Sequence, residues 1–331
     1  MANRDIVVIG ASAGGVEALS VLVSLLPSDL PAAVFVAYHV APSHPGFLPS
    51  ILRRHSALPV KHADDAEAFQ RGVVYVARPD HHLVVKRETL SFARGPRENL
   101  HRPSVDALFR SAAYAYGPRV ISVVLTGNLD DGSAGNWAVK AFGGVTIAQD
   151  PKEAVHPDMP RNAILYSKVD HVAPVAQIPA LISRLVREEV PDRGEARVNE
   201  TEIRVPESEL RGNPGVEELG APSFFTCPSC DGTLWEFNHG DLIRYRCRTG
   251  HAFSFESMMA EQAEALERAL WVAVRTLEEK ADLMRRMAAH AARRTTPERA
   301  RHYLQEQTKA KEDADLLRQV LKTSHSPVDA E

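Results

Sequence analysis

The chain has 331 residues, with 39 Lys and Arg against 43 Asp and Glu, which gives a formal net charge of −4 at pH 7. At roughly 150 residues per domain, this length predicts about two domains. The content of hydrophobic residues (44%) and charged residues (25%) is ordinary for folded soluble protein and excludes wholesale disorder. The near-neutral charge balance gives no electrostatic reason to expect a nucleic-acid partner.

No stretch of the sequence predicts insertion into a membrane. The longest apolar run, residues 32–41, is far shorter than the roughly 20 residues that a membrane-spanning helix needs. The first apolar run follows the N-terminus almost directly, without the basic segment, apolar segment and cleavage site of a secretory signal. We therefore expect a cytoplasmic protein.

Residues 1–190 alternate between strand patterns and helix patterns. Short apolar runs rich in β-branched residues predict strands at residues 6–9, 33–38, 73–76 and 120–125. Helical patterns lie between some of them, at residues 15–26, 47–55 and 105–115. This alternation predicts an α/β/α domain with a doubly wound, mostly parallel sheet. Residues 83–92 alternate in polarity and predict a hairpin strand appended to that domain.

A glycine-rich turn, Gly-Ala-Ser-Ala-Gly-Gly at residues 10–15, connects the first predicted strand to the first predicted helix. A dinucleotide-binding turn would have a glycine in place of Ser12 and an acidic residue at the end of the second strand, and both are missing. The turn fits G-x-S-x-G instead, in which small neighbours expose a nucleophilic serine at a helix N-terminus. Ser12 is therefore a candidate nucleophile, and the alternative is that it only caps the helix.

A nucleophilic serine needs a base, and the base needs an acid that orients it. His39 directly follows the second predicted strand, and Asp130 and Asp131 follow a later one. Because the carboxyl ends of parallel strands meet at one edge of a sheet, these side chains are expected close to Ser12. A histidine after a strand and paired acids before a glycine are common in ordinary loops, so only the combination favours a catalytic site.

Several motifs within residues 4–188 resemble the catalytic domain of the CheB-type protein-glutamate methylesterases of bacterial chemotaxis. In order, they are residues 9–15 (IGASAGG), His39, residues 101–106 (HRPSVD), 125–127 (LTG), 131–132 (DG), 148–150 (AQD) and 159–164 (MPRNAI). The resemblance implies a serine hydrolase with a catalytic triad. Ser12 maps to the nucleophile, His39 to the general base and Asp131 to the orienting acid. Asp130 is less favoured, because the family's acid immediately precedes the glycine.

The resemblance also implies a substrate and products. Ser12 would attack a γ-glutamyl methyl ester of a methylated chemoreceptor-type protein, and hydrolysis of the acyl-enzyme would give methanol and a free glutamate. The same acyl-enzyme would serve in the deamidation of glutamine. Backbone N–H groups at Ala13 and around Asn128 are the candidate oxyanion donors. No cofactor is expected for catalysis.

The sequence departs from the family's pattern in two places. The family's turn reads Thr-Gly-Met-Gly-x-Asp-Gly, whereas Asn128 and Leu129 replace the Met and the second Gly here. If Leu129 cannot adopt the backbone conformation that a glycine allows, the oxyanion geometry differs from that of the family. The receiver domain that normally precedes the esterase is not expected, because few residues come before the first strand.

Residues 191–222 predict a linker, and residues 223–255 a small zinc ribbon. The ribbon contains all three cysteines, in the pattern C-x2-C-x16-C-x3-H formed by Cys227, Cys230, Cys247 and His251. Four ligands in two close pairs suit one tetrahedral Zn²⁺ with no open position, so the zinc is expected to be structural. The alternative is three buried thiols and a surface histidine. Since a linker separates the two cores, a chain ending near Val190 is expected to keep basal activity.

Residues 256–323 predict two amphipathic helices in a helical hairpin or coiled coil, and residues 324–331 a disordered tail. The expected apolar stripe of the first helix consists of Leu266, Leu270, Ala273, Leu277, Met284 and Met287. The second helix is expected to begin at Thr296-Pro297-Glu298 and to end near Leu321. These helices are a candidate surface for a signalling partner. The alternative function is accordingly a catalytically weak adaptor or scaffold in a chemotaxis-like signalling complex.

Overall fold

A computed structural model describes residues 2–190, 220–239, 242–293 and 297–324 of the chain. The chain divides into two compact units, Met1–Met258 and Met259–Glu331. The predicted linker lies outside the described residues except at its C-terminal end, and so does the predicted tail after Ser324. No described helix combines the length and the apolar character that crossing a membrane requires.

A seven-stranded parallel sheet forms the centre of the first unit, with the strand order β10-β9-β8-β2-β3-β5-β4. Its strands are β2 (Ile6–Ala11), β3 (Ala33–Tyr38), β4 (Val60–His62), β5 (Val74–Val76), β8 (Val120–Val124), β9 (Val145–Gln149) and β10 (His171–Ala173). The predicted doubly wound parallel sheet is confirmed. The strand order reverses at β2, between β3 and β8, which is where open sheets of this kind bind ligands.

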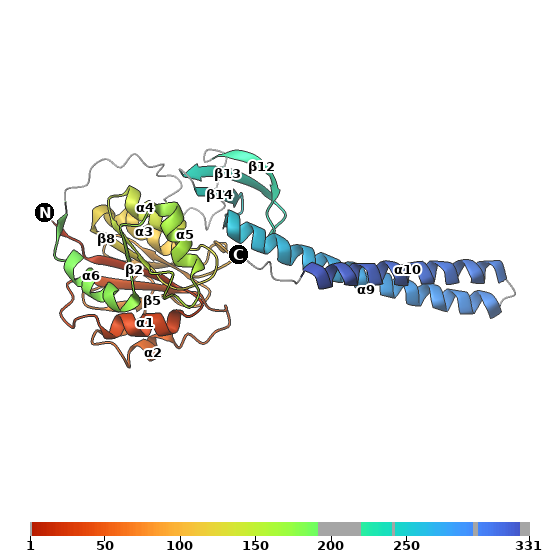
Figure 1. The fold of residues 1–331 in the computed structure, drawn as a ribbon, viewed down its shortest axis with the longest axis horizontal. Helices are drawn as coiled ribbons and strands as arrows, with labels where there is room; N and C mark the ends of the chain where they lie inside the picture. The colour runs from red at the N-terminus through yellow and green to blue at the C-terminus, as the bar shows by residue number, and fades with distance from the viewer. Residues whose placement is uncertain (1, 191–219, 240–241, 294–296, 325–331) are drawn as a thin grey trace. The chain divides into compact units, whose positions relative to one another are not determined.

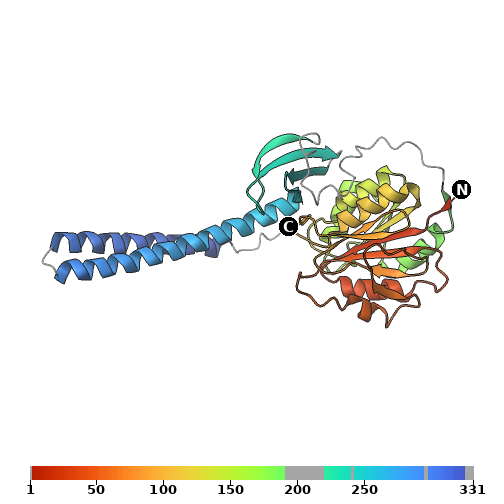
Figure 2. The same cartoon turned by 180° about the vertical axis from the view of Figure 1, so that it is seen from behind.

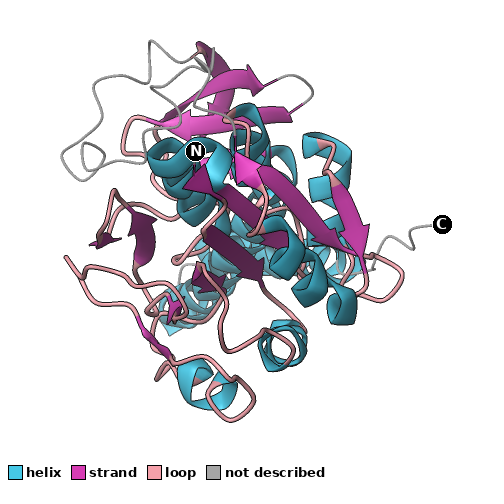
Figure 3. Cartoon of the chain, turned by 90° about the vertical axis from the view of Figure 1, so that its left-hand side faces the viewer, coloured by secondary structure: helices cyan, strands magenta, loops and turns pink. Residues whose placement is uncertain are grey.

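Helices cover both faces of the sheet (Figures 1 and 3). One face carries α1 (Gly15–Ser24), α2 (Leu48–Leu52) and α6 (Ile178–Leu185), and the other α3 (Val105–Tyr116), α4 (Ser133–Ala141) and α5 (Asp158–Ser167). Successive residues of β2 enter opposite cores: Val7 and Ile9 pack on the first face, Ile6 and Val8 on the second. Burial on both faces explains why the strands are continuous apolar runs.

Smaller elements complete the α/β domain. The expected hairpin is β6 (His82–Val85) and β7 (Leu90–Ala93), which form a separate two-stranded antiparallel sheet. β1 (Ala2–Asn3) pairs with β11 (Glu189–Val190), and two 3-10 turns, η1 (Gly117–Arg119) and η2 (Val175–Gln177), precede β8 and α6. The strands β4, β9 and β10 were not predicted, because their apolar runs are short or interrupted by polar residues.

Residues 220–258, here called the cysteine module, belong to the first unit. The module contains an antiparallel sheet of β12 (Ala221–Thr226), β13 (Thr233–His239), β14 (Leu242–Cys247) and β15 (Ala252–Ser254). Its core consists of Cys227, Leu234, Tyr245, Cys247, Phe253 and Met258. Leu100, from the loop that precedes α3, packs against this core. The module and the α/β domain are therefore joined by packing as well as by the chain.

α9 (Phe255–Arg293) and α10 (Pro297–Ser324) run side by side in the second unit (Figure 2). α10 begins at Pro297, as predicted. The predicted apolar stripe is only partly right, because Leu266 and Met287 are exposed. Beyond Met258, the buried positions of α9 are instead Val274, Ala281, Ala288 and Ala291, and the first three lie seven residues apart. Small residues at heptad spacing let two helices approach closely, and alanines contribute little to an apolar pattern read from sequence.

Candidate active site

The ends of three neighbouring strands bring Ser12 and His39 to one edge of the sheet. Ala11 lies opposite Tyr38 in the last register pair of β2 and β3, so Ser12 and His39 are the next residues on the two strands. The N–H of His39 donates to the carbonyl of Ala11 at 3.2 Å. The N–H of Ser12 donates to the carbonyl of Thr126, just after β8, at 2.9 Å. These backbone contacts fix where both side chains begin.

Asp131 is buried at the N-terminal end of α3, where five donors surround its carboxylate. Its Oδ2 accepts from His39 Nε2 at 2.7 Å and from the N–H of Val105 at 2.7 Å. Its Oδ1 accepts from the hydroxyl of Ser104 at 3.0 Å, the side-chain amide of Asn99 at 3.0 Å and the N–H of Asp106 at 3.1 Å. The imidazole of His39 is thus oriented by a carboxylate whose own position is fixed by four further hydrogen bonds.

These contacts keep Asp131 ionised. Burial alone would raise its pKa, but the hydrogen bond and charge of His39, together with the N–H of Val105, hold the pKa of Asp131 well below its usual range. The positive end of α3 acts in the same direction. With Nε2 donating to Asp131, the other ring nitrogen, Nδ1, is an acceptor. This Nδ1 is buried without a hydrogen-bond partner among the described residues, so it can receive a proton from a nucleophile.

The neighbouring acid, Asp130, has the opposite environment. Its Oδ1 accepts from the hydroxyl of Ser254, in β15 of the cysteine module, at 2.6 Å. Burial, together with the charge of Glu256, raises the pKa of Asp130 well above its usual value despite the hydrogen bond from Ser254. The neutral form of Asp130 is therefore favoured, and its contacts lie with the module instead of with His39.

A second imidazole lies against the first. The rings of His39 and His101 stack with centroids 3.6 Å apart and planes inclined by 13°. Burial and the neighbouring His39 lower the pKa of His101 to about 3, so it remains uncharged over the neutral range. His101 can therefore fix the orientation of His39 without adding a competing charge. The motif at residues 101–106 drew attention to this segment, but sequence spacing gave no sign of the stacking.

Asn99 is a site residue that the sequence analysis missed. Its side-chain amide is 2% exposed and donates to both Asp131, at 3.0 Å, and Asp106, at 2.8 Å. Asp106 in turn accepts from the N–H groups of Gly132 at 3.0 Å and Gly135 at 2.6 Å, so it shapes the turn that follows Asp131. A single asparagine in a loop carries no sequence signal, and only its contacts reveal it.

The turn after β8 is packed directly against Ser12. A Cβ on Gly127 would lie 2.0 Å from Met159 Sδ and 2.7 Å from Ser12 Cβ, so no side chain fits there. Leu129 has a φ of 60°, the left-handed conformation that a glycine adopts freely, and its carbonyl accepts from the amide of Asn162 at 2.9 Å. The leucine therefore adopts a backbone conformation of the kind that favours glycine, at the cost of some strain.

Backbone donors are available beside Ser12. The N–H of Gly127 is engaged, because it donates to the carbonyl of His156 at 2.9 Å. Within the described part of the chain, the N–H groups of Ala13 and Asn128 donate no hydrogen bond. They are thus free to donate to a negatively charged oxygen at this edge of the sheet.

A cavity of about 300 Å³ opens beside His39. Much of its wall is apolar and includes Val16, Tyr38, Phe47, Ile51 and Val76. The imidazoles of His44 and His62 also line it. Concave, mainly apolar recesses with few polar groups are typical of substrate-binding sites. The recess therefore offers room for an aliphatic segment next to the base.

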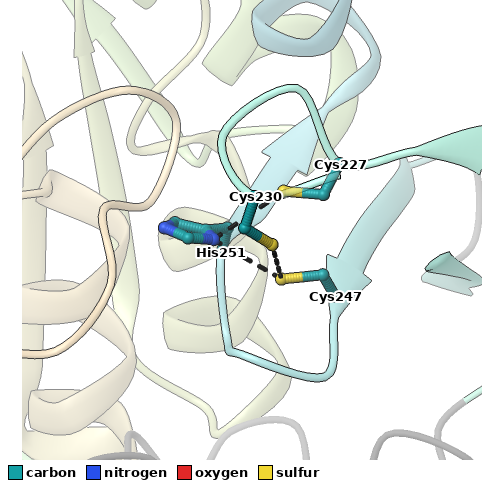
Figure 4. A group of neighbouring side chains, drawn as sticks. All are labelled: Cys227, Cys230, Cys247 and His251. Carbon is teal, nitrogen blue, oxygen red and sulfur yellow. Dashed lines mark hydrogen bonds between the residues drawn. The ribbon is translucent and has the colours of Figure 1, made fainter. Parts of the chain in front are cut away.

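The four predicted metal ligands come together in the cysteine module (Figure 4). Their ligand atoms all lie within 4.8 Å of one another, and the three cysteines are free of disulfides. Cys230 Sγ lies 3.7 Å from Cys247 Sγ, and His251 Nδ1 lies 3.5 Å from Cys247 Sγ and 3.7 Å from Cys227 Sγ. This arrangement is compatible with a bound metal ion.

Comparison with known proteins identifies the family. The CheB methylesterase family profile matches residues 7–182, which is more than half of the chain. A solved structure, the CheB methylesterase catalytic domain of Thermotoga maritima, is similar with a TM-score of 0.53 and 35% identity. The match covers 56% of this chain and all of that domain.

Curated relatives match over the same region. A Leptospira interrogans relative is 36% identical over 184 residues, which are 55% of this chain and 95% of that protein. The protein-glutamate methylesterase/protein-glutamine glutaminase 2 of Methanosarcina mazei is 38% identical over 192 residues, which are 56% of this chain and 52% of that protein. The chain thus spans only about half the length of the latter relative. Because the family profile covers most of the α/β domain described above, the chain belongs to the CheB methylesterase family.

Proposed function

We propose that the chain is a cytoplasmic protein-glutamate methylesterase that demethylates γ-glutamyl methyl esters on a chemoreceptor-type protein and also deamidates glutamines. The observation that carries this proposal is the 2.7 Å contact between His39 and Asp131, at the strand end next to Ser12. Relatives that share this α/β domain are named for both reactions. Three free thiols fit a compartment in which cysteines stay reduced.

In the proposed reaction, Ser12 Oγ forms a bond to the ester carbonyl carbon while Nδ1 of His39 takes the hydroxyl proton. The buried Asp131 carboxylate stabilises the imidazolium that results, and the N–H groups of Ala13 and Asn128 donate to the oxyanion. His39 then protonates the departing methoxide, which leaves as methanol. Water, deprotonated by His39, attacks the acyl-enzyme, releasing the glutamate side chain and restoring Ser12. With a glutamine substrate, the first leaving group is ammonia.

The cysteine module is proposed to hold one structural Zn²⁺ through Cys227, Cys230, Cys247 and His251. Zinc–sulfur bonds of about 2.3 Å and zinc–nitrogen bonds of about 2.0–2.1 Å in a tetrahedron separate two sulfurs by about 3.8 Å and a sulfur and a nitrogen by about 3.6 Å. The separations of 3.7 Å between Cys230 Sγ and Cys247 Sγ, and of 3.5 Å and 3.7 Å from His251 Nδ1 to two cysteine sulfurs, fit that geometry. Four protein ligands fill the coordination sphere, so the ion would stabilise the fold instead of activating water.

A second candidate is an adaptor whose C-terminal helices bind a signalling partner while the α/β domain serves as a scaffold. Two observations favour it. Leu129 is a strained residue where the family's pattern has glycine, and α9 carries the exposed apolar side chains Leu266, Trp271 and Val272. The two candidates differ in whether Ser12 is required for any chemical change in the substrate.

The experiment that separates them measures methanol release from methylated chemoreceptor membranes. Ser24→Ala is the matched control, because Ser24 lies at the far end of α1 and its hydroxyl bonds only to the carbonyl of Val21 among the described residues. The esterase proposal predicts release by the wild type and the control and none by Ser12→Ala. Equal release by all three proteins, or none by the wild type, would favour the adaptor.

A further inference from the structure

We propose that the cysteine module completes the active site by holding the Asn99 loop (residues 98–101) against Asp131 and His39, so that metal binding in the module sets the rate of catalysis. The inference rests on the proposed function and adds a form of control to it. Asn99 is a positioning residue in this account, since it acts on the substrate only through Asp131.

Asn99 is the direct link between the two parts. Its amide nitrogen donates to Asp131, while its amide oxygen accepts from the N–H of Ser254 at 3.1 Å and the hydroxyl of Ser257 at 3.3 Å. The backbone N–H of Asn99 donates to the carbonyl of Ala252 at 2.9 Å. One side chain thus connects the catalytic acid with β15 and the first turn of α9.

The two residues that follow Asn99 contact the cysteine module and the catalytic base. Leu100 packs against the core of the cysteine module, which includes two of the proposed metal ligands, Cys227 and Cys247. His101 stacks on His39 on the other side. Asn99 and Leu100 both have positive φ angles, of 46° and 72°. Asparagine adopts this conformation readily, but a leucine keeps it only where the surroundings impose it. The contacts with the module supply that constraint.

Buried charges reinforce the same interface. Glu98 is 3% exposed and pairs with Arg110 of α3 at 2.5 Å. Two arginines from β14 approach it as well, Arg246 at 3.4 Å and Arg244 at 3.5 Å. Arg244 also lies 3.7 Å from Asp106, the residue that shapes the turn after Asp131. Loss of one partner from a buried ionic cluster leaves an uncompensated charge, so this interface tolerates displacement poorly.

The metal site lies directly next to these contacts in the chain. His251 is a proposed ligand, and the next residue, Ala252, begins the strand that accepts from Asn99 and leads to Ser254. The N–H of Cys247 donates to the carbonyl of His251 at 3.0 Å, which ties both ligands to the start of β15. Loss of the ion would loosen β15 first, and with it Asn99. A chain ending near Val190 would therefore lose activity, contrary to the expectation from sequence.

The test uses the full-length protein loaded with zinc and a fluorophosphonate probe, which bonds to an activated serine with loss of fluoride. The rate constant of Ser12 labelling at saturating probe, the probe affinity and the final labelled fraction are measured for the wild type, Cys230→Ser and Ser257→Ala. Phe224→Ala is the matched control, because Phe224 lies in the same module with a fully exposed side chain. Zinc content is measured for each protein.

We expect Cys230→Ser to lose zinc and to label roughly 10–100-fold more slowly, because misplacement of a catalytic group by about 1 Å has effects of this size. Ser257→Ala should slow labelling by less than about tenfold. Probe affinity and the final labelled fraction should stay at the wild-type level, and Phe224→Ala should behave as wild type. In a double variant, Cys230→Ser should add little to the loss caused by Asn99→Ala, because both act through one contact.

Two results would overturn the inference. One is a zinc-free Cys230→Ser protein that labels at the wild-type rate. The other is a lower final labelled fraction with an unchanged rate constant, which would mean that the module only keeps part of the population folded. A wild-type protein that does not label at Ser12 at all would instead refute the proposed function, and the inference with it.

Discussion

A comparison of Asp130 with Asp131 shows how different surroundings can give adjacent carboxyl groups different roles. Asp131 lies at the N-terminal end of α3 and accepts hydrogen bonds from five donors. Burial would raise its pKa, but the contact with His39 more than offsets this and holds the pKa low. Asp130 meets the cysteine module through Ser254, and burial raises its pKa. An ionised acid is suited to orienting a base, and a neutral one to joining two buried surfaces.

The largest effect is expected for the residues that act together with Asp131. Ser12→Ala and His39→Ala should each lower the kcat/KM for methanol release by roughly 10³–10⁴-fold or more, because triad members act as a unit. The double variant should be little worse than either single variant. Losses that multiply in the double variant would show that Ser12 and His39 act independently, which contradicts the proposed roles.

His101 should make the free energy of unfolding depend on pH. Its pKa is about 3 in the folded protein and about 6.5 in an unfolded chain, so below pH 6.5 protons bind preferentially to the unfolded state. Folding stability is therefore lost as the pH falls from about 6.5 towards 3. By pH 5 the loss from this residue is about 2 kcal/mol.

His101→Phe keeps an aromatic ring in contact with His39 but removes this proton linkage. The difference in free energy of unfolding between pH 7 and pH 5, measured by urea titration, should be smaller for the variant by about 2 kcal/mol. His81→Phe is unsuitable as a control, because His81 is only partly exposed and packs on Phe92. The exposed His290→Phe serves instead. Parallel pH profiles for wild type and His101→Phe would contradict the neutral, buried state of His101.

The turn at Leu129 should give a smaller effect. Leu129→Gly removes the strain of a left-handed leucine, which is about 1–2 kcal/mol. Glycine also gives the unfolded chain more conformational freedom, which lowers the free energy of unfolding by up to about 1 kcal/mol. A net gain in stability of about 0.5–1 kcal/mol is expected, with a change in turnover and no change of nucleophile. Thermal denaturation and methanol release measure the two quantities. An unchanged turnover would mean that residue 129 does not set the positions of the oxyanion donors.

The helical hairpin should affect catalysis least. Ala314→Asp would bury an unpaired carboxylate in the seam of α10, where Ala314 is 1% exposed, and should lower helix content on heating. Leu316→Asp, at a position 60% exposed, is the matched control and should leave melting unchanged. Ester hydrolysis should be unaffected by both. Similar melting of both variants would show that the seam is assigned to the wrong face of α10.

The sequence predicted the parts of this molecule whose cause is local. Continuous apolar runs identified β2, β3 and β8, because strands buried on both faces need them. The turn chemistry at residues 10–15 and the position of His39 after its strand placed both side chains at one edge. Asn99 and the stacking of His101 could not be predicted, since they depend on a loop held from more than 150 residues away by Ser254. The alanine seam of α9 was misassigned because small residues leave a weak pattern.

The most direct test of the account compares Ser12 labelling by a fluorophosphonate probe in wild type, Asp131→Asn and Asp130→Asn, with peptide mapping to locate the label. Asparagine at position 131 would place an amide nitrogen among five donors, so labelling should slow by roughly 10³-fold or more. Asparagine at position 130 mimics a neutral carboxyl and still accepts from Ser254, so labelling should stay within about threefold of wild type. Equal losses in the two variants, or a label on another residue, would contradict the assignment of Ser12, His39 and Asp131.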